Sequence, residues 1–277
     1  MYKDCMRGSL NPKNIYDVWK YKIDDFRKNP FHFRVFGTCI FCGIQGSGKT
    51  LSGVQYVLKV CDLYKRAILV TNTAILSRPF NTELIFDDEG VHLVYKGIIE
   101  INTEWILNHA DDDDFEPVTL EYTGLDMLKY VNNNEYGVLY FIDELHLELN
   151  SLESKNIDIE VMVEISQQRK QRKHIVGTSQ VFMRLAKPLR EQIHDIVLCK
   201  CILSCIQWNT WIDGTTAIEE NGKLKADTKG HFLWFHSPEL YSQYDTYTKM
   251  RRYNQEWQGR KRIDIYSKEA EYVEFSK

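Results

Sequence analysis

An eight-residue loop constrains the fold of this chain more than any other feature of its sequence. Residues 43–50 read Gly-Ile-Gln-Gly-Ser-Gly-Lys-Thr, which fits the pattern G-x-x-x-x-G-K-[ST]. An apolar, β-rich run precedes the loop over residues 33–42. After the loop, apolar residues recur at helical spacing at Leu51, Val54, Val57, Leu58 and Cys61. The sequence therefore predicts a strand, a phosphate-binding loop and a helix in that order.

Each residue type in the loop has a chemical reason. Glycines let the backbone wrap so that its N–H groups point at a β-phosphate, with the positive end of the helix dipole behind them. Lys49 is expected to reach the β- and γ-phosphates of ATP, and the Thr50 hydroxyl to bind Mg²⁺. The expected nucleotide-binding residues are Gly43, Gln45, Gly46, Ser47, Gly48, Lys49, Thr50 and Leu51. The alternative, an accidental glycine-rich turn, is disfavoured by the strand–loop–helix context.

A second motif ends in two acids. Residues 138–144 read Val-Leu-Tyr-Phe-Ile-Asp-Glu, an apolar run typical of a buried strand with an acidic pair at its carboxyl end. Ligands bind at that end of the strands in open α/β sheets. We expect Asp143 to hold the Mg²⁺ and Glu144 to activate the attacking water as a general base. The alternative is an acidic pair that only caps a strand.

Two more candidates flank the next predicted strand, residues 174–180. Gln180 closes it, where a glutamine can hydrogen-bond a γ-phosphate or the lytic water, although Thr-Ser-Gln strand ends are also common without that role. Before the strand, residues 167–173 predict the basic end of a helix over 154–170. Its cations either complement the helix dipole or supply an arginine finger to a neighbouring subunit.

The remaining pattern predicts an α/β fold. Strands expected at 66–72, 91–95, 97–101, 137–143, 174–180, 195–212 and 231–235 alternate with helices at 124–131, 154–170 and 183–194. That alternation favours a mostly parallel sheet with helices on both faces. Asn221-Gly222 predicts a small C-terminal hairpin. We expect an arm over 1–32 with a helix near 16–26, an ATPase domain over 33–247, and a basic, aromatic tail over 248–277.

The charge of the chain narrows the functional classes to which it can belong. The net charge of −4 over 277 residues excludes a globally basic nucleic-acid binder, so any DNA contact must be local. Two local candidates are 249–262, where cations alternate with Tyr253 and Trp257, and 182–190; a solvated basic tail is the alternative for the first. Four successive aspartates, 111–114, are expected to form a solvated loop in preference to a metal site.

Seven cysteines, an odd number, sit mostly in predicted strands and helices and lack zinc-site spacing. The C-x-x-C pair at Cys39 and Cys42 falls in the strand before the loop, where core packing is expected. With no signal-peptide pattern and no apolar run long enough to span a bilayer, a reduced cytoplasmic location is expected, in the host cytoplasm if the chain is viral.

The order and spacing of these motifs resemble the FtsK–HerA superfamily of DNA-translocating ATPases, and most of all the zonula-occludens-toxin-like (Zot) proteins of filamentous phages. The resemblance rests on residues 141–144, on 165–180 and on Arg190, with support from the tyrosine-rich segment 239–247, and spans about 33–247. It implies a RecA-like, additional-strand (ASCE) P-loop fold that uses ATP and Mg²⁺. It also implies that Arg169 is the arginine finger, with Arg172 as the fallback, and that Gln180 is the sensor.

The resemblance further implies an ATP-hydrolysing motor that moves DNA for a phage or mobile element, in packaging, extrusion or transfer, as a homo-oligomeric ring such as a hexamer. Filamentous-phage Zot proteins usually continue into a transmembrane segment, and this sequence has none, which favours packaging or transfer. The rival interpretation is a nucleotide-switched assembly or morphogenesis factor that never moves DNA. A small-molecule kinase is disfavoured by Glu144, and an ABC-type ATPase by the lack of a Leu-Ser-Gly-Gly-Gln signature.

Overall fold

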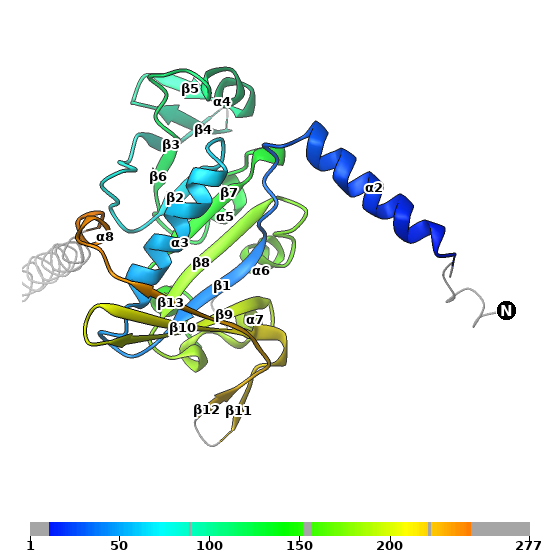
Figure 1. The fold of residues 1–277 in the computed structure, drawn as a ribbon. Coiled ribbons are helices and arrows are strands. Elements are labelled where there is room, and N and C mark those ends of the chain that lie inside the picture. The colour runs from blue at the N-terminus through cyan, green and yellow to red at the C-terminus, as the bar shows by residue number, and fades with distance from the viewer. Residues whose placement is uncertain (1–10, 89, 152–156, 221–222, 245–277) are drawn as a thin grey trace, which may run out of the picture. The chain divides into compact units, whose positions relative to one another are not determined.

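The computed structural model describes residues 11–88, 90–151, 157–220 and 223–244 (Figure 1). The chain divides between His32 and Phe33 into two compact units. The first contains helix α2 (Lys13–Lys28), which is longer than the helix expected near 16–26. The proposed tail, 248–277, lies outside the described residues, so the three-part division of the chain stays a prediction.

The second unit is built on an 11-stranded sheet in the order β13-β10-β9-β1-β8-β7-β2-β6-β3-β4-β5. The strands are β1 (Gly37–Cys42), β2 (Ile68–Thr71), β3 (Thr82–Asp87), β4 (Gly90–Tyr95), β5 (Ile99–Ile101), β6 (Thr119–Glu121), β7 (Val138–Ile142), β8 (Lys173–Ser179), β9 (Ile193–Ile202), β10 (Ile206–Asp213) and β13 (Thr228–Phe235). The central strands from β9 to β3 are parallel, and the strands at both edges pair antiparallel.

One strand separates the two motif-bearing strands. β8 pairs in parallel with β1, which leads into the phosphate loop, and with β7, which ends before the acidic pair. Because all three run the same way, their carboxyl ends meet at one edge of the sheet. This strand order is that of the additional-strand P-loop fold, and the predicted fold class is confirmed.

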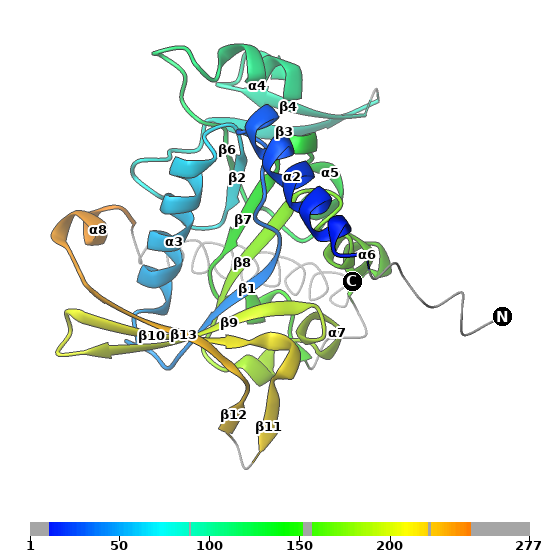
Figure 2. The ribbon, with the colours of Figure 1, turned by 45° about the vertical axis from the view of Figure 1, so that its right-hand side comes forward.

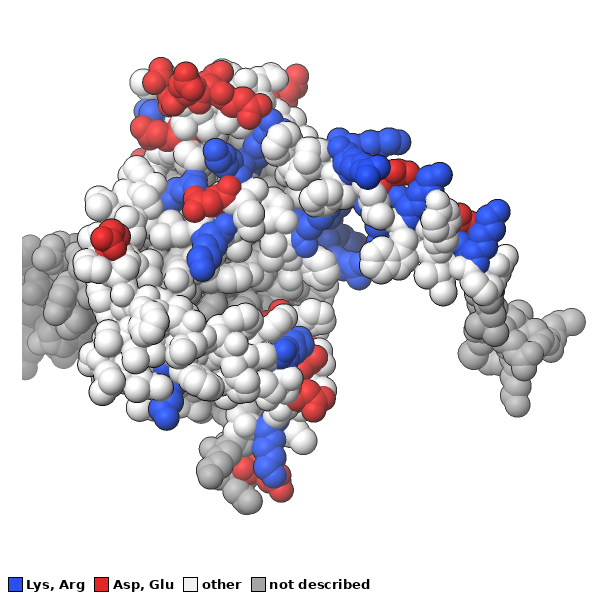
Figure 3. Space-filling view, viewed as in Figure 1, with Lys and Arg blue, Asp and Glu red and all other residues white. Residues whose placement is uncertain are grey.

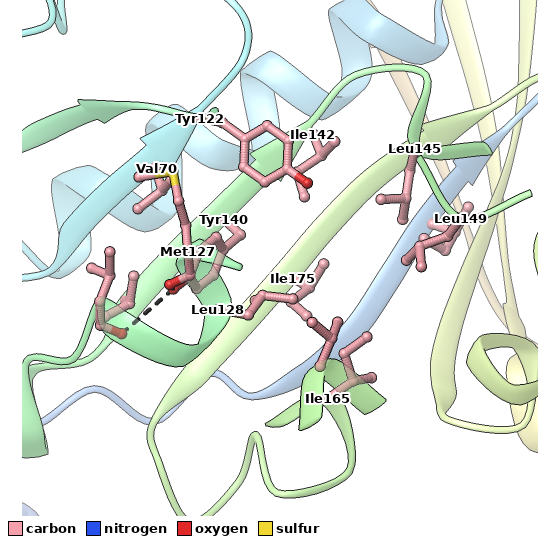
Figure 4. Packing of buried hydrophobic residues seen from close by; sticks show 14 of the residues in the cluster. Val70, Tyr122, Met127, Leu128, Tyr140, Ile142, Leu145, Leu149, Ile165 and Ile175 are labelled. Carbon is pink, nitrogen blue, oxygen red and sulfur yellow. Dashed lines mark hydrogen bonds between the residues drawn. The ribbon is translucent and has the colours of Figure 1, made fainter. Parts of the chain in front are cut away.

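Helices cover both faces of the sheet (Figures 1 and 2). Side chains that alternate along a strand point to opposite faces. In β7, for example, Leu139 and Phe141 join the apolar cluster under α3 (Lys49–Leu63), whereas Tyr140 and Ile142 join the opposite cluster. The second cluster is covered by α4 (Thr103–His109), α5 (Met127–Tyr130), α6 (Ile159–Ser166) and α7 (Lys187–Arg190). Figure 4 shows side chains from β7, β8, α5 and α6 packed into it.

The smaller elements connect the strands. They are the 3₁₀ turns η1 (Asn134–Tyr136), η2 (Leu145–Leu147), η4 (Phe182–Arg184) and η5 (Gly214–Thr216), the strands β11 (Ile218–Glu220) and β12 (Lys223–Lys225), and helix α8 (Pro238–Ser242). β11 and β12 pair antiparallel on either side of Asn221-Gly222, which confirms the predicted small hairpin. No helix in the described ranges combines the length and the apolarity needed to cross a membrane.

Several expected elements have other bounds. The helix predicted over 154–170 is α6, and residues 167–172 form turns, so the basic helix end is wrong. In 183–194 only η4 and α7 are helical, because β9 begins at Ile193. The stretch 195–212 divides into parts of two antiparallel strands, β9 and β10, joined by a turn, and neither β3 nor β6 was predicted. The four aspartates, 111–114, are exposed in a turn, as expected, and Figure 3 shows acidic side chains gathered over α4 and β5.

Candidate nucleotide site

The phosphate loop joins β1 to α3 at the carboxyl edge of the sheet. Gly46 and Gly48 adopt left-handed backbone angles, with φ of 78° and 77°. A side chain is strained at such angles, so glycine is needed for the loop to close. Lys49 and Thr50 form the first turn of α3, where unpaired backbone N–H groups and the helix dipole favour an anion.

The acidic pair lies directly beside the loop. Thr50 Oγ1 donates a hydrogen bond of 2.9 Å to Asp143 Oδ1. Lys49 Nζ lies 3.3 Å from Glu144 Oε1. Residues 93 positions apart in the chain therefore meet because β1 and β7 end at the same edge. This is the juxtaposition that the sequence motifs require.

Further side chains hold the acidic pair in place. Thr178 Oγ1, near the end of β8, donates to Asp143 Oδ1 at 2.6 Å, and the same hydroxyl accepts from the Glu144 backbone N–H at 2.9 Å. Asn72, just after β2, accepts from Asp143 N at 2.8 Å and donates to Asp143 O at 3.0 Å. Neighbouring strands on both sides of β7 thus fix its carboxyl end.

The oxygen groups at this point suit a magnesium ion. Mg²⁺ prefers carboxylate, hydroxyl and phosphate oxygens, and proteins commonly bind it through one or two side chains plus the phosphates of a nucleotide. Thr50 and Asp143 supply one hydroxyl and one carboxylate, in contact with each other. Across the described ranges, no group of three or more His, Cys, Asp or Glu side chains is placed to hold a metal ion.

Glu144 has an unusual backbone. Its φ of 56° is left-handed, which costs free energy for a residue with a side chain. One carboxylate oxygen faces Lys49, and the other lies 3.3 Å from Nδ1 of the buried His146. Strained conformations of this kind cluster at functional sites, where the surrounding structure maintains them.

Gln180 emerges between the two motifs. It follows Ser179, the last residue of β8, which pairs with Cys42 of β1; the Gly43 N–H donates to Ser179 O at 3.2 Å. On the other side, Gly177 pairs with Ile142, the residue before Asp143. The topology therefore places Gln180 at the same edge, between the loop and the acidic pair.

A cavity of about 310 Å³ adjoins the loop. Its lining comprises Gly46, Gly48, Lys49, Thr50 and Leu51 together with Cys201, Ser204, His236, Tyr241 and Tyr244. Burial, with a smaller contribution from the Asp143 charge, raises the pKa of Tyr244 to about 12. None of the residues of this second wall was predicted to bind nucleotide: Cys201 and Ser204 fall in the predicted strand 195–212, and Tyr241 and Tyr244 belong to the tyrosine-rich segment 239–247, to which no role in the site was assigned.

A larger hollow, of about 520 Å³, lies between α3 and the strands β9, β10 and β13, with Tyr56, Trp211 and Phe232 in its lining. It includes none of the residues of the phosphate loop. Over β10 and β13, the face drawn in Figure 3 carries few charged side chains. The phosphate chemistry therefore assigns the nucleotide to the smaller cavity.

The two candidate arginines lie at the opposite edge of the sheet. Arg169 is exposed in the turn before β8, with its guanidinium 5.1 Å from the centre of the Phe36 ring, just before β1. Arg172 is held within its own chain, since its Nε donates to Glu135 at 3.0 Å and its Nη1 to the Phe33 carbonyl at 3.1 Å. Neither is brought to the phosphate loop of the same chain.

Two other residues of the basic run are structural. Lys173 is buried, and its Nζ donates to Leu128 O at 2.6 Å and to Glu164 at 2.9 Å. Gln168 is also buried and donates from Nε2 to Thr38 Oγ1 of β1 at 2.8 Å. These contacts anchor the turn that carries Arg169.

Fold and site together define a P-loop nucleoside triphosphatase of the additional-strand class. Among solved structures, the chain is similar to the N-terminal domain of zonular occludens toxin from Neisseria meningitidis, with 16% identity over 76% of this chain and 100% of that chain and a TM-score of 0.46. A Zot-type structure is thus among those similar to this chain, as the sequence resemblance predicts.

Two further solved structures are similar. One is the genome packaging NTPase B204 from Sulfolobus turreted icosahedral virus 2, in complex with ATP-gammaS, with 10% identity over 73% of this chain and 97% of that chain and a TM-score of 0.41. The other is B204, the DNA-packaging ATPase from Sulfolobus turreted icosahedral virus, with 10% identity, the same coverage of 73% and 97%, and a TM-score of 0.39. No protein-family model and no curated protein matches the sequence.

Proposed function

We propose that this chain is a Mg²⁺-dependent ATPase that moves DNA, in the packaging, extrusion or transfer of a phage or mobile-element genome, and that it works as a ring of identical subunits. The observation that carries the ATPase part is the contact between the phosphate loop and the acidic pair: Thr50 to Asp143 at 2.9 Å and Lys49 to Glu144 at 3.3 Å. A pair of carboxylates in this position serves hydrolysis, because one is available for the metal and the other for water.

Each residue then has one task. The loop backbone and Lys49 bind the β- and γ-phosphates, and Thr50 and Asp143 hold the magnesium ion. When bound, that ion neutralises charge on the phosphates. Glu144 orients the attacking water and accepts its proton, and Gln180 hydrogen-bonds the γ-phosphate or that water.

Two observations support DNA as the molecule that the ATPase moves: the sequence resemblance and one surface feature. Arg184 and Lys187 are exposed in η4 and α7, the segment that directly follows Gln180. A residue that senses the γ-phosphate is therefore joined by a few residues to cations that can contact a phosphate backbone. The basic stretch 249–262 lies outside the described residues.

Support for the ring comes from the position of Arg169. The guanidinium lies at the amino end of β8, whereas the phosphate loop lies at the carboxyl end. A seven-residue strand spans roughly 20 Å. Arg169 is thus too far away to reach the phosphates bound in its own chain. As an arginine finger, it contacts the phosphates bound by a neighbouring subunit.

An ATPase assay with and without single- and double-stranded DNA tests the proposal, with Lys49→Ala as the inactive control. The expected result is Mg²⁺-dependent hydrolysis that DNA stimulates. Hydrolysis that no DNA affects would exclude the motor and favour the nucleotide-switched assembly factor. A wild-type rate no higher than that of Lys49→Ala would exclude the ATPase.

A further inference from the structure

We propose that residues 236–244, here called the strap, form the nucleoside half of the nucleotide site and that Tyr241 packs against the base. This inference rests on the proposed function and deepens it, since it names the part of the site that selects a nucleoside triphosphate over inorganic polyphosphate. The strap runs from the end of β13 through α8, and Figures 1 and 2 both show α8 beside α3.

The position of the cavity relative to the sheet gives the first argument. The acidic pair, which marks the γ-phosphate end, follows β7, and β7 is separated from β1 by β8. On the other side of β1 lies β9, which supplies Cys201 to the cavity wall, and the turn from β9 to β10 supplies Ser204. A triphosphate with its γ-phosphate toward Asp143 therefore extends its nucleoside toward β9 and the strap.

The lining has the chemistry of a nucleoside site. The cavity measures about 310 Å³, at the lower end of the range for small-molecule sites. One wall is the phosphate loop, and the other carries His236, Tyr241 and Tyr244. Aromatic side chains stack on nucleobases of any sequence because every base has a π-face.

Tyr241 is held in a defined orientation. Its hydroxyl donates to the Ser204 carbonyl at 3.2 Å and contacts Nδ1 of His236. The His236 and Tyr241 rings meet edge to face, with centroids 5.5 Å apart. Tyr241 as a residue is nevertheless 48% exposed, so it keeps accessible surface beside the cavity. An oriented, partly exposed ring at a cavity wall is preorganised for stacking.

The strap is tied down at both ends. At its start the His236 N–H donates to Cys205 O at 2.8 Å, and His236 Nε2 lies 3.1 Å from Gln207 Oε1. At its end Leu76 N donates to Gln243 O at 2.6 Å, and Tyr244 pairs with Ile75 in an isolated bridge. The residues that hold the two ends of the strap belong to the second unit, as the phosphate loop does, so the strap forms a fixed wall of the cavity.

One buried side chain links this wall to the phosphate loop. Gln207 of β10 is fully buried and donates from Nε2 to Ser47 O at 2.9 Å, while its Oε1 faces His236. A Cβ at Gly48 would lie 2.1 Å from Gln207 Oε1, so glycine is also needed there for this contact. The loop and the strap therefore hold one relative position, as binding of a single nucleotide across both requires.

Calorimetric titration of the full chain with ATP and with inorganic tripolyphosphate tests the inference. Tyr241→Ala is expected to weaken ATP binding about tenfold, the effect of removing one stacking ring, and to leave tripolyphosphate binding unchanged. Tyr241→Phe keeps the ring and should bind ATP nearly as the wild type does. Phe235→Ala is the matched control, since Phe235 is a more exposed aromatic residue, 71% exposed, and does not line the cavity.

Each possible outcome either supports or overturns the nucleoside site. Unchanged ATP affinity in Tyr241→Ala, or an equal loss for ATP and tripolyphosphate, overturns the nucleoside site and leaves the proposed ATPase standing. A wild-type chain that binds neither ligand overturns the proposed function and the nucleoside site together. Photolabelling of the wild type with 8-azido-ATP needs no variant: label is expected on the peptide containing 236–244, and label confined to other peptides contradicts the inference.

Discussion

Lys49 Nζ lies 3.3 Å from Glu144 Oε1, and this ion pair closes the space between the phosphate loop and the acidic pair. The two side chains are only 9% and 20% exposed, so solvent screens their attraction weakly. A lysine that binds the β- and γ-phosphates must exchange this carboxylate for phosphate oxygens. In the proposed mechanism, nucleotide binding therefore has a second consequence: it releases Glu144 to face the attacking water.

This exchange predicts the behaviour of Glu144→Gln. The amide cannot accept a proton from water, so turnover should fall at least about 100-fold. ATP affinity should equal or exceed that of the wild type, because a neutral side chain competes less for Lys49. Steady-state hydrolysis and equilibrium ATP binding measure the two effects separately.

Glu148→Gln is the control for that experiment. Glu148 is exposed and lies only four residues further along, at the end of η2, so it undergoes the same chemical change outside the site. Wild-type turnover in Glu144→Gln would remove Glu144 from the mechanism.

Asn72 gives a prediction about the metal. Its side-chain amide bonds both the N–H and the carbonyl of Asp143, at 2.8 and 3.0 Å. In Asn72→Ala the carboxylate loses this orientation, and the Mg²⁺ concentration for half-maximal hydrolysis should rise about tenfold. A Mg²⁺ titration of ATPase activity measures this, with the exposed Asn108→Ala of α4 as the control. Superimposable titration curves for Asn72→Ala and the wild type would contradict a role in holding Asp143.

The central fold was predictable because its signals are local. A buried parallel strand reads as an apolar run, and β1, β7 and β8 each contain one; the glycine-rich loop follows the run in β1, and polar residues follow those in β7 and β8. β3 lacks this signal, since only its first residue, Thr82, is buried and the strand is otherwise mostly exposed. Its pairing with β4 is local, from Thr82 with Tyr95 to Asp87 with Gly90, so the missing signal lies in the strand itself and not in distant contacts.

The supporting residues of the site could not be assigned from the sequence for a different reason. Gln207 lies 160 positions from Ser47, and Thr178 lies 35 from Asp143. Asn72 did carry a signal, a polar residue at the end of an apolar strand. The prediction of a basic helix end over 167–173 was wrong because the burial of Lys173 and the pairing of Arg172 with Glu135 depend on tertiary structure, which the local sequence does not show.

Buried His174 predicts how stability depends on pH. Burial lowers its pKa to about 4. Nδ1 contacts the Gly37 carbonyl at 2.8 Å, which can only accept, so the neutral ring donates there and accepts from the Tyr56 hydroxyl at 3.0 Å. Since the folded pKa lies below the unfolded value of about 6.5, this contribution is full above pH 6.5 and is lost as the pH falls toward 4. The loss amounts to about 3 kcal/mol.

Urea unfolding of the wild type and of His174→Gln at pH 7 and pH 4 measures this effect. His174→Gln should be less stable than the wild type at pH 7. From pH 7 to pH 4, however, its free energy of unfolding should fall by about 3 kcal/mol less than that of the wild type. His231→Gln, on the exposed part of β13, should keep the wild-type pH dependence. Equal pH dependence in His174→Gln and the wild type would show that His174 does not contribute.

Arg169→Ala should lose hydrolysis by about 1,000-fold without losing ATP affinity, because a finger acts on the transition state. Lys170→Ala removes the adjacent exposed cation and should stay active. Full activity of Arg169→Ala, or undiminished activity of the wild type as a dilute monomer, would contradict a finger in trans.

Mixing two inactive variants separates a neighbour's arginine from one that acts in its own chain. Arg169→Ala keeps an intact phosphate loop, and Lys49→Ala keeps the arginine, which lies a strand's length away from its own disabled loop. In a mixed ring, a site formed by the loop of the first and the arginine of the second is complete. Random assortment of equal amounts makes roughly a quarter of the sites complete, so hydrolysis should return toward that fraction of the wild-type rate. If Arg169 served its own site, no mixture would contain a complete one, and the mixed sample would stay as inactive as its parts.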